Sequence, residues 1–476
     1  MKSTSLHLRW LQIALTFAAI QSVTVVGALA QSEAASTAPA PTSSAPVASA
    51  AIAQTPHESW SKGKYISGDW DTLRTKLQSH GVDPFVYWTG ITSGNPLGGA
   101  KQGHVTAVDD FYMGANFDLN KIVGWKDAVL TVSGINRDGQ GLSNDYIQGQ
   151  YNVQQCVGGQ NLFFYELVLK QSLDKGKVNL KVGRFSASDD LNASPIYSLS
   201  LNNGIDGDIR NVLFDTQSSA YPFSTWAGLV KYQPNNKFIL HSAVFQTWDN
   251  VFNSKTNGTD WSIHGDDGVI YMEQAAWTPM LFKGASDSQK ETINGTQSAG
   301  LPGHYWLGTT YTPWKGFTPF AVQLAQSQGS ANPGSKVGNS YGFYAHADQM
   351  VHQKSPGSAQ GLTVWTAAAY YPQQNISIIP FQLNFGTFYT GFWNKRPEDK
   401  TIFNLIYGKF SRDYAHMEMA QGKGNPLYEV VLEGAHRFQL SRFSFFQPDM
   451  QWEVRPGGTG RIRNAIAVGG ELGITF

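Results

Sequence analysis

The sequence has little charge, almost no cysteine and, beyond residue 30, no long hydrophobic run. Charged side chains make up 15% of the 476 residues, with 35 basic and 35 acidic groups, whereas about 25% is usual in soluble domains. This neutral balance argues against a nucleic-acid partner. The single cysteine, Cys156, excludes an internal disulfide framework and a zinc site built from several cysteines. We expect no metal and no other cofactor.

The chain also lacks the short motifs of the common enzyme classes. It contains no G-x-S-x-G, H-E-x-x-H, P-loop or dinucleotide fingerprint. The aspartate pairs at 109–110 and 266–267 are interpreted as solvated turn carboxylates. Residues 136–139 and 205–208 resemble calcium loops only in part, because the later bidentate glutamate is missing. The sequence therefore predicts a protein that is not an enzyme.

The N-terminus has the pattern of a secretory signal peptide. Lys2 and Arg9 precede an apolar region up to residue 29, and Ala-Leu-Ala at 28–30 offers a cleavage site. Residues 1–30 are therefore expected to be removed. The alternative is an uncleaved membrane anchor, which the polar residues within the apolar region disfavour.

No apolar stretch near the length of a membrane-spanning helix follows residue 30, so a membrane-embedded chain must form a closed barrel. Residues 31–57 are rich in Ala, Ser, Thr and Pro, which predicts a disordered linker. Residues 58–82 are expected to form a short amphipathic helix that ends near Gly81 and leads into the first strand. Its apolar face would be formed by Trp70, Leu73 and Leu77.

Residues 83–476 alternate between apolar and polar side chains, as β-strands do. The last segment is clear, because Phe476, Ile474 and Leu472 alternate with small or polar residues. A soluble barrel would turn such an apolar face inward. Here the polar face carries charges of both signs at mid-strand, as a water-filled lumen requires. The prediction is an all-β chain that forms a transmembrane antiparallel β-barrel.

Sixteen strands can be placed in this region, an even number as single-chain bacterial barrels require. They lie near 83–93, 108–120, 127–137, 161–173, 177–185, 225–233, 237–247, 268–277, 304–313, 340–350, 362–371, 376–390, 400–411, 427–440, 444–454 and 464–476. Residues 318–326 are excluded as a seventeenth strand on parity alone. The short turns fall on the periplasmic side, and the long loops 138–160, 186–224, 248–267 and 314–339 fall outside. The turn at 372–375 falls on the extracellular side, where a long loop is expected, although it is very short. At least one strand assignment between 277 and 376 therefore conflicts with this scheme. Tryptophans near strand ends suit interfacial girdles, namely Trp226, Trp248, Trp277, Trp306, Trp393 and Trp452.

Several segments in order resemble one known family. They are Gly68-Asp-Trp…Arg74-Thr-Lys-Leu…His80-Gly-Val82, Lys181-Val-Gly-Arg-Phe185, Glu433-Gly-Ala-His-Arg-Phe438, Gln447-Pro-Asp-Met-Gln451 and Gly473-Ile-Thr-Phe476. The chain from about residue 60 resembles the OprB-type carbohydrate-selective porins, although Asp71-Thr72 replaces a usual Gly-Gly. The resemblance implies a sixteen-stranded outer-membrane channel for glucose and similar sugars, constricted by charged residues from the wall and from inward-folded loops. It also implies outer-membrane lipid and assembly machinery as partners, Phe476 as an assembly signal, and either a monomer or a homotrimer.

Passive sugar passage needs weak, serial contacts from charged groups and flat rings. The candidate wall residues are Glu166, Lys170, Lys181, Glu433, Arg437, Glu453 and Glu471. Arg184 would share the lipid face with Val182 under strict alternation, which is unfavourable at mid-depth. Gly183 permits a bulge that returns Arg184 to the lumen. The alternative is an arginine at the membrane rim.

The loop 186–224 is the longest between well-defined strands, and such loops usually have a function. We expect it to fold into the barrel and to narrow it, with an extracellular cap as the alternative. Its candidate pore residues are Asp189, Asp190, Asp208 and Arg210. A constriction built from these acids would disfavour anions relative to neutral sugars.

Two rival functions remain open at this point. One is a secreted all-β carbohydrate-active enzyme that uses two carboxylates, such as Glu166 and Asp189, for glycoside hydrolysis. The other is a plugged outer-membrane barrel with an adhesive or structural role.

Overall fold

Sixteen long strands make up most of the protein in a computed structural model, which describes residues 63–282, 292–293, 296–297, 300–355 and 357–476. The expected signal peptide and linker lie outside these residues. The long strands are β1 (Val82–Gly99), β2 (Val105–Asp118), β3 (Ala128–Gly139), β4 (Leu162–Leu173), β5 (Val178–Phe185), β6 (Thr225–Tyr232), β7 (Phe238–Thr247), β8 (Gly268–Trp277), β12 (Leu301–Thr312), β13 (Ser340–Gln353), β14 (Gly361–Tyr370), β15 (Phe381–Thr390), β16 (Lys400–Lys409), β17 (Tyr428–Ser441), β18 (Ser444–Val454) and β19 (Arg463–Thr475). Each corresponds to one of the sixteen predicted strands. The other strands are the two-residue pieces β9 (Met280–Leu281), β10 (Thr292–Ile293) and β11 (Thr296–Gln297).

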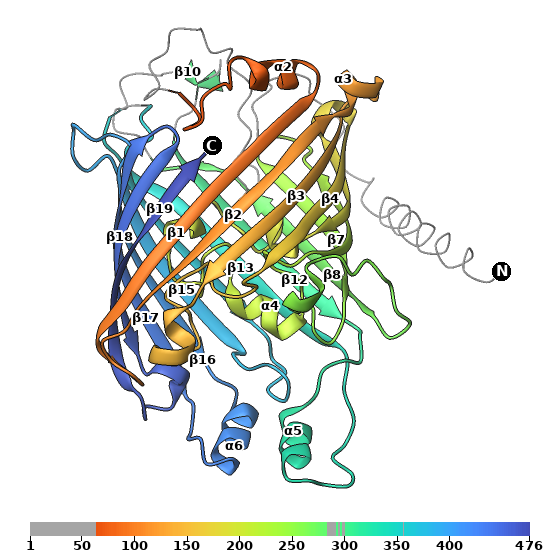
Figure 1. The fold of residues 1–476 in the computed structure, drawn as a ribbon, viewed down its shortest axis with the longest axis vertical. Coiled ribbons are helices and arrows are strands. Elements are labelled where there is room, and N and C mark those ends of the chain that lie inside the picture. Colours follow the sequence, from red (N-terminus) through yellow and green to blue (C-terminus); the bar gives the residue numbers. More distant parts are fainter. Residues whose placement is uncertain (1–62, 283–291, 294–295, 298–299, 356) are drawn as a thin grey trace, which may run out of the picture. The chain divides into compact units, whose positions relative to one another are not determined.

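The strands close into one antiparallel barrel (Figure 1). Each long strand pairs with its neighbours in the sequence, and β1 pairs with both β2 and β19. The closing pair runs from Tyr87 opposite Thr475 to Gly99 opposite Arg463. Closure satisfies the backbone groups of what would otherwise be two free edges. The predicted fold, a transmembrane barrel of sixteen strands with a short N-terminal helix, is confirmed. No helix in the described part of the chain is both long and apolar enough to cross a membrane.

The strand assignments between 277 and 376 hold, and the conflict comes from one wrong boundary. Strand β15 begins at Phe381 rather than at 376, so the connection from β14 covers residues 371–380 and is long enough for the outside. Residues 318–326, excluded on parity, belong largely to helix α5 (Phe320–Ser327). Helix α5 lies beside α6 (Arg412–Ala420) at the end of the barrel opposite the chain's C-terminus (Figure 1).

Apolar side chains cover the outside of the barrel while polar ones point inward. Leu307 is 61% exposed and Met450 is 56% exposed, whereas buried polar groups lie between such positions on the same strands. Trp277, Trp393 and Trp452 are exposed in the same way. Trp306, expected in the interfacial girdle, is instead buried inside the barrel and stacks on His346 with ring centroids 5.1 Å apart.

The N-terminal helix α2 (Leu73–Ser79) packs through an arginine rather than through its predicted apolar face. Trp70 and Leu73 are exposed, while Arg74 is only 2% exposed. Gly81, which follows the helix, has φ +90°, and a Cβ there would lie 2.9 Å from the carbonyl oxygen of Asp118. Only glycine fits this turn without strain. The short helix α3 (Leu119–Val123) lies at the same end of the barrel (Figure 1).

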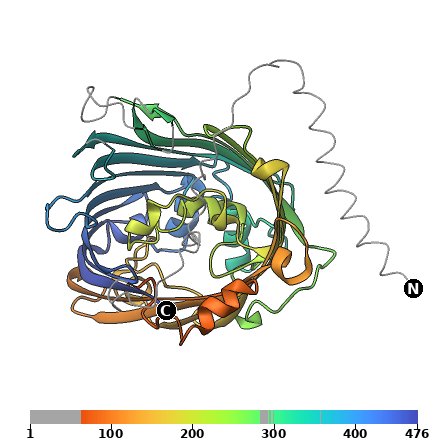
Figure 2. The same ribbon diagram turned by 90° about the horizontal axis from the view of Figure 1, so that it is seen from above.

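Two extracellular loops fold into the barrel, as the view along its axis shows (Figure 2). The first is 186–224, which contains helix α4 (Arg210–Thr216) and was predicted to enter. The second is 140–161, which was placed on the extracellular side without a predicted inward course. Glu429 of β17 accepts hydrogen bonds of 2.9 Å from the backbone N–H groups of Gln150 and Tyr151, which draws this loop inward.

Candidate functional site

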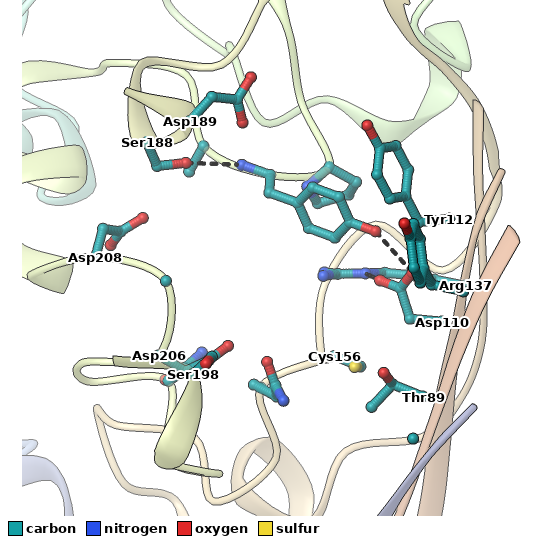
Figure 3. A pocket seen from close by; sticks show the side chains of 18 of the residues that line it. Thr89, Asp110, Tyr112, Arg137, Cys156, Ser188, Asp189, Ser198, Asp206 and Asp208 are labelled. Atoms are coloured by element: carbon teal, nitrogen blue, oxygen red, sulfur yellow. Dashed lines mark hydrogen bonds and ion pairs between the residues drawn. The ribbon is translucent and has the colours of Figure 1, made fainter. Parts of the chain in front are cut away.

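A cavity of about 860 Å³ lies inside the barrel (Figure 3). Its lining extends from the periplasmic turn between β17 and β18, at Arg442 and Phe443, to the extracellular loops at Gly159 and Phe252. Both inward loops contribute side chains. The polar side chains of the strands face this space because alternation keeps the apolar ones on the outer surface.

Nine of the twelve predicted pore residues line this cavity. They are Glu166, Lys170, Lys181, Asp189, Asp190, Asp208, Arg210, Arg437 and Glu471. The structure therefore brings together residues from β4, β5, β17 and β19 with residues from the loop 186–224.

Lys181 ties the constricting loop to the barrel wall. Its Nζ lies 2.7 Å from Asp190 Oδ2 and 3.6 Å from Asp189 Oδ2. The hydroxyl of Tyr165 donates to Asp189 over 2.5 Å. Burial raises the pKa of Asp189 to about 6, while the positive charge of Lys181 opposes that rise. For Asp190 burial acts in the same direction, but the charge and hydrogen bond of Lys181 prevail and lower the pKa.

Arg437 of β17 makes a second link between the barrel wall and the constricting loop. It donates to Gln447 over 2.6 Å, to the carbonyl oxygen of Ser198 over 2.7 Å and to Glu471 over 3.2 Å. Glu471 also accepts from Gln155 of the second inward loop over 2.9 Å. Arg437 thus links β17, β18 and β19 with the constricting loop.

Asp206, Asp208 and Arg210 present ionisable groups to the cavity that other side chains do not satisfy. In the described structure no hydrogen bond or ion pair joins either carboxylate to a side chain, and the Arg210 guanidinium has none either. Burial raises the pKa of Asp208 to about 7, with the nearby Arg210 charge opposing it. Burial lowers the pKa of Arg210 to about 10.

An ion pair that the sequence analysis missed stands on the β2–β3 side of the cavity. Arg137 Nε donates to Asp110 Oδ2 over 2.6 Å, and the Tyr221 hydroxyl donates to Asp110 Oδ1 over 2.7 Å. The interpretation of Asp110 as a solvated turn carboxylate is wrong, because Asp110 lies within β2 and is buried. Aligning β2 against β3 could have revealed the pair, since Asp110 and Arg137 are directly opposed.

Arg184 does not reach the lumen, and the predicted bulge at Gly183 is wrong. Strand β5 keeps its register with β4 as far as Arg184 and with β6 as far as Phe185. Arg184 therefore stays on the outer face, opposite Leu167 and Trp226. The irregularity occurs instead in β4, where Ser133 pairs with Glu166 and Gly134 pairs with Phe164.

Arg184 is nevertheless only 2% exposed because an extracellular loop covers it. Its guanidinium donates to the carbonyl oxygens of Asp260 and Ser224, each over 2.8 Å. Residues 248–267, which fold back over the outer wall, and Ser224 at the end of the constricting loop thus provide one hydrogen bond each, which lipid could not.

Glu433 and Glu453 face inward but do not line the cavity, because the constricting loop covers them. Glu433 is 0% exposed and accepts from the Ser200 hydroxyl over 2.5 Å and from the Leu201 N–H over 2.6 Å. Glu453 accepts from the Asn202 side chain over 3.2 Å. Both carboxylates bind the loop.

Glu166 and Asp189 do not form a hydrolytic pair. Glu166 accepts hydrogen bonds from Tyr112 over 2.6 Å and from Ser133 over 2.8 Å, and Asp189 is held by Tyr165 and Lys181. Among the described residues no group of three or more His, Cys, Asp or Glu side chains is arranged to hold a metal ion.

A closed sixteen-stranded barrel with an apolar outer face and a charged cavity narrowed by its own loops is a porin of the bacterial outer membrane. The profile of the carbohydrate-selective porin, OprB family, matches residues 104–476. The chain belongs to this family and is a sugar channel rather than an enzyme.

Individual relatives agree with this assignment. The chain is 26% identical to Porin B of Pseudomonas aeruginosa over 446 residues, which covers 87% of this chain and 91% of that protein. It is 23% identical to a putative porin, QuiX, of Acinetobacter baylyi, covering 88% and 95% of the two chains. Among solved structures, the high-pH structure of Pseudomonas putida OprB has the same fold, with a TM-score of 0.78 at 24% identity, covering 88% of this chain and all of that one.

Proposed function

We propose that the protein mediates passive diffusion of glucose and similar small sugars into the periplasm through the cavity between the two inward loops. The single observation that carries this proposal is the set of nine predicted charged residues around one space inside the barrel. Such groups form hydrogen bonds with the sugar hydroxyls in place of water. Because each contact is weak and the contacts are made in series, the sugar can both enter and leave.

The lining residues divide into two roles in this proposal. Asp206, Asp208, Arg210 and Lys170 contact the solute, because the described structure shows no ion pair that occupies them. The Lys181–Asp190 ion pair and the hydrogen bond from Arg437 to the carbonyl oxygen of Ser198 set the width of the passage by holding the constricting loop to the wall.

Glu433 and Glu453 act through the loop that they bind. Arg184 has no part in the constriction and holds the outer loop instead.

Selectivity against anions follows from the composition of the constricting loop. It brings Asp189, Asp190, Asp206 and Asp208 to the cavity but only one base, Arg210. A gluconate anion is therefore expected to pass more slowly than glucose of nearly the same size.

The decisive experiment is swelling of liposomes that contain the purified protein. Rapid swelling in glucose and slow swelling in a larger oligosaccharide support a size-limited sugar channel. Absence of swelling in glucose would favour the plugged barrel. Hydrolysis of a glycoside by detergent-free protein would favour the enzyme.

Assembly follows from the same proposal. Residues 1–30 direct export and are removed, residues 31–57 remain as a linker, and the outer-membrane assembly machinery recognises the C-terminal strand with Phe476. Deletion of Phe476 should reduce the amount of heat-modifiable barrel in the membrane, and normal insertion would contradict this role. Cross-linking in native membranes distinguishes a monomer from a homotrimer.

A further inference from the structure

The outer surface of the barrel carries two cations at its extracellular end, where β16, β17 and β18 lie side by side. They are Lys409, the last residue of β16, and Arg455, which directly follows β18. A Cβ at Gly408 would collide with the hydroxyl of Tyr151, which belongs to an inward loop. Gly408 therefore faces the lumen, and the exposed Lys409 faces outward because successive residues of a strand alternate.

Arg455 is held against the same outer surface by Tyr428. Because Glu429 accepts a hydrogen bond from the inward loop 140–161, the adjacent Tyr428 faces outward. The guanidinium of Arg455 lies 4.8 Å from the centre of the Tyr428 ring, and its Nη2 donates to the carbonyl oxygen of Gly458 over 3.1 Å. Lys409 and Tyr428 are directly opposed in the β16–β17 pair. The ring of Tyr428 thus places the two cations next to each other.

Neither cation is neutralised by a carboxylate. Within the described part of the chain, Lys409 and Arg455 form no ion pair. The residues that flank Lys409 in register are the uncharged Phe381 and Tyr428. The outward-facing positions of β15–β18 contain no acidic residue. An anion on this part of the wall therefore meets two positive charges and no opposing one.

Aromatic rings lie at the same level as the two cations and just below them. Phe381, Tyr407 and Tyr428 form a row across β15, β16 and β17, with ring centroids 6.4 Å and 6.1 Å apart. In transmembrane barrels such rings mark the height of the lipid headgroups. Lys409 and Arg455 are therefore placed at the height where the phosphates of the outer leaflet lie.

The wall below these rings is apolar. Phe385, Leu405, Leu432 and Trp452 occupy one outward-facing row across β15–β18, since each is opposed in register to the next. Phe385 and Trp452 are exposed. Acyl chains can lie along this surface while the headgroup above them reaches the two cations.

We propose that Lys409 and Arg455 form a binding site for the phosphate of an outer-leaflet lipid whose acyl chains lie along β15–β18. The Arg455 guanidinium has further N–H groups to donate to phosphate oxygens besides the one that binds Gly458, and the Lys409 ammonium adds a compact positive charge. The site does not depend on sugar passage. It fixes the extracellular rim of these strands to the membrane.

The test measures binding of diphosphoryl lipid A to the purified protein in a nonionic detergent by native mass spectrometry. The wild-type protein should bind the lipid, and Lys409→Ser with Arg455→Ser should bind it about five-fold more weakly for each base removed. Lys409→Ser alone serves if the double variant does not assemble, because Lys409 is an exposed residue at a strand end.

The matched control is Lys255→Ser with Lys315→Ser, which removes two exposed lysines from other extracellular loops and should leave the affinity unchanged. Equal affinities of the wild type and the Lys409 and Arg455 variants, or an equal loss in the control, would overturn the site. Equal binding of lipid A without its phosphates would overturn it too, because the cations would then have no role. Inorganic phosphate should not displace the lipid, and full displacement would assign the cations to free phosphate instead.

Discussion

The guanidinium of Arg74 donates a hydrogen bond of 3.0 Å to the main-chain oxygen of Phe476, and a second of 3.0 Å to the carbonyl oxygen of Pro84. The rings of Tyr65 and Trp70 lie against the same guanidinium, at 3.8 and 4.2 Å. One buried side chain from α2 therefore joins β1 to the end of β19, where the barrel closes.

Replacement of Arg74 should weaken this closure. Arg74→Ala removes a charged donor from two part-buried main-chain oxygens, with an expected loss of about 1–3 kcal/mol for each hydrogen bond. Arg74→Lys keeps the charge but cannot reach both oxygens with a planar fork, so its loss should be intermediate. The temperature at which the folded band disappears on an SDS gel measures the effect. Equal temperatures for all three proteins would show that the contact adds nothing to the barrel.

Arg184→Ala should leave the channel's conductance and ion selectivity unchanged, because Arg184 faces away from the lumen. It should instead release residues 248–267, which protease digestion from the outside would detect. Arg437→Ala is the matched control, since Arg437 lines the cavity and its loss should alter conductance. A change in conductance for Arg184→Ala would place this residue in the pore after all.

Asp208 should make ion selectivity depend on pH near neutrality. Burial raises its pKa to about 7, so the carboxyl is neutral below that pH and negatively charged above it. Cation selectivity should therefore rise as the pH increases through about 7. Because folding of the loop raises the pKa of Asp208, the protonated carboxyl stabilises the folded loop at low pH. This stabilisation is lost as the pH rises towards 7.

Reversal potentials across planar bilayers measure ion selectivity, and we would record them between about pH 5 and 9. A free aspartate, with its ordinary pKa of about 4, would produce no change in selectivity over this range. Asp208→Asn should remove the part of the step near pH 7, whereas the part that Asp189 contributes near pH 6 should remain. An identical titration in Asp208→Asn would assign the step to other groups.

Lys181→Met should loosen the constricting loop, because Asp189 and Asp190 then repel each other without a cation between them. The expected result is larger and noisier single-channel conductance. Lys170→Met is the matched control. Lys170 also lines the cavity, but in the described residues it forms no ion pair, so its loss changes the charge without releasing the loop. Quiet channels in both variants would mean that Lys181 does not hold the loop.

The barrel was predictable because the patterns that specify its strands can be recognised from residues close together in the sequence. Alternation along segments such as Val430–Leu432 and the parity of the strand count depend only on neighbouring residues and on closure. Nine pore residues followed from the same alternation and from the length of one loop.

The missed features depend on contacts between residues far apart in the chain. The inward course of 140–161 depends on Glu429, which is distant in the sequence. Arg184 was misplaced because the outer loop that satisfies it, at Asp260, leaves no periodic signal. Arg74 became the buried residue of α2 because Phe476 supplies its acceptor. In each case a partner from another strand or loop outweighs the local pattern.

Glu429 and Glu433 hold the two inward loops from a strand that is made late in synthesis. Strand β17 also pairs with β16 and β18, so the strand that completes the wall is the one whose carboxylates seat both loops. Closure of the barrel and narrowing of its lumen are therefore coupled through a single strand.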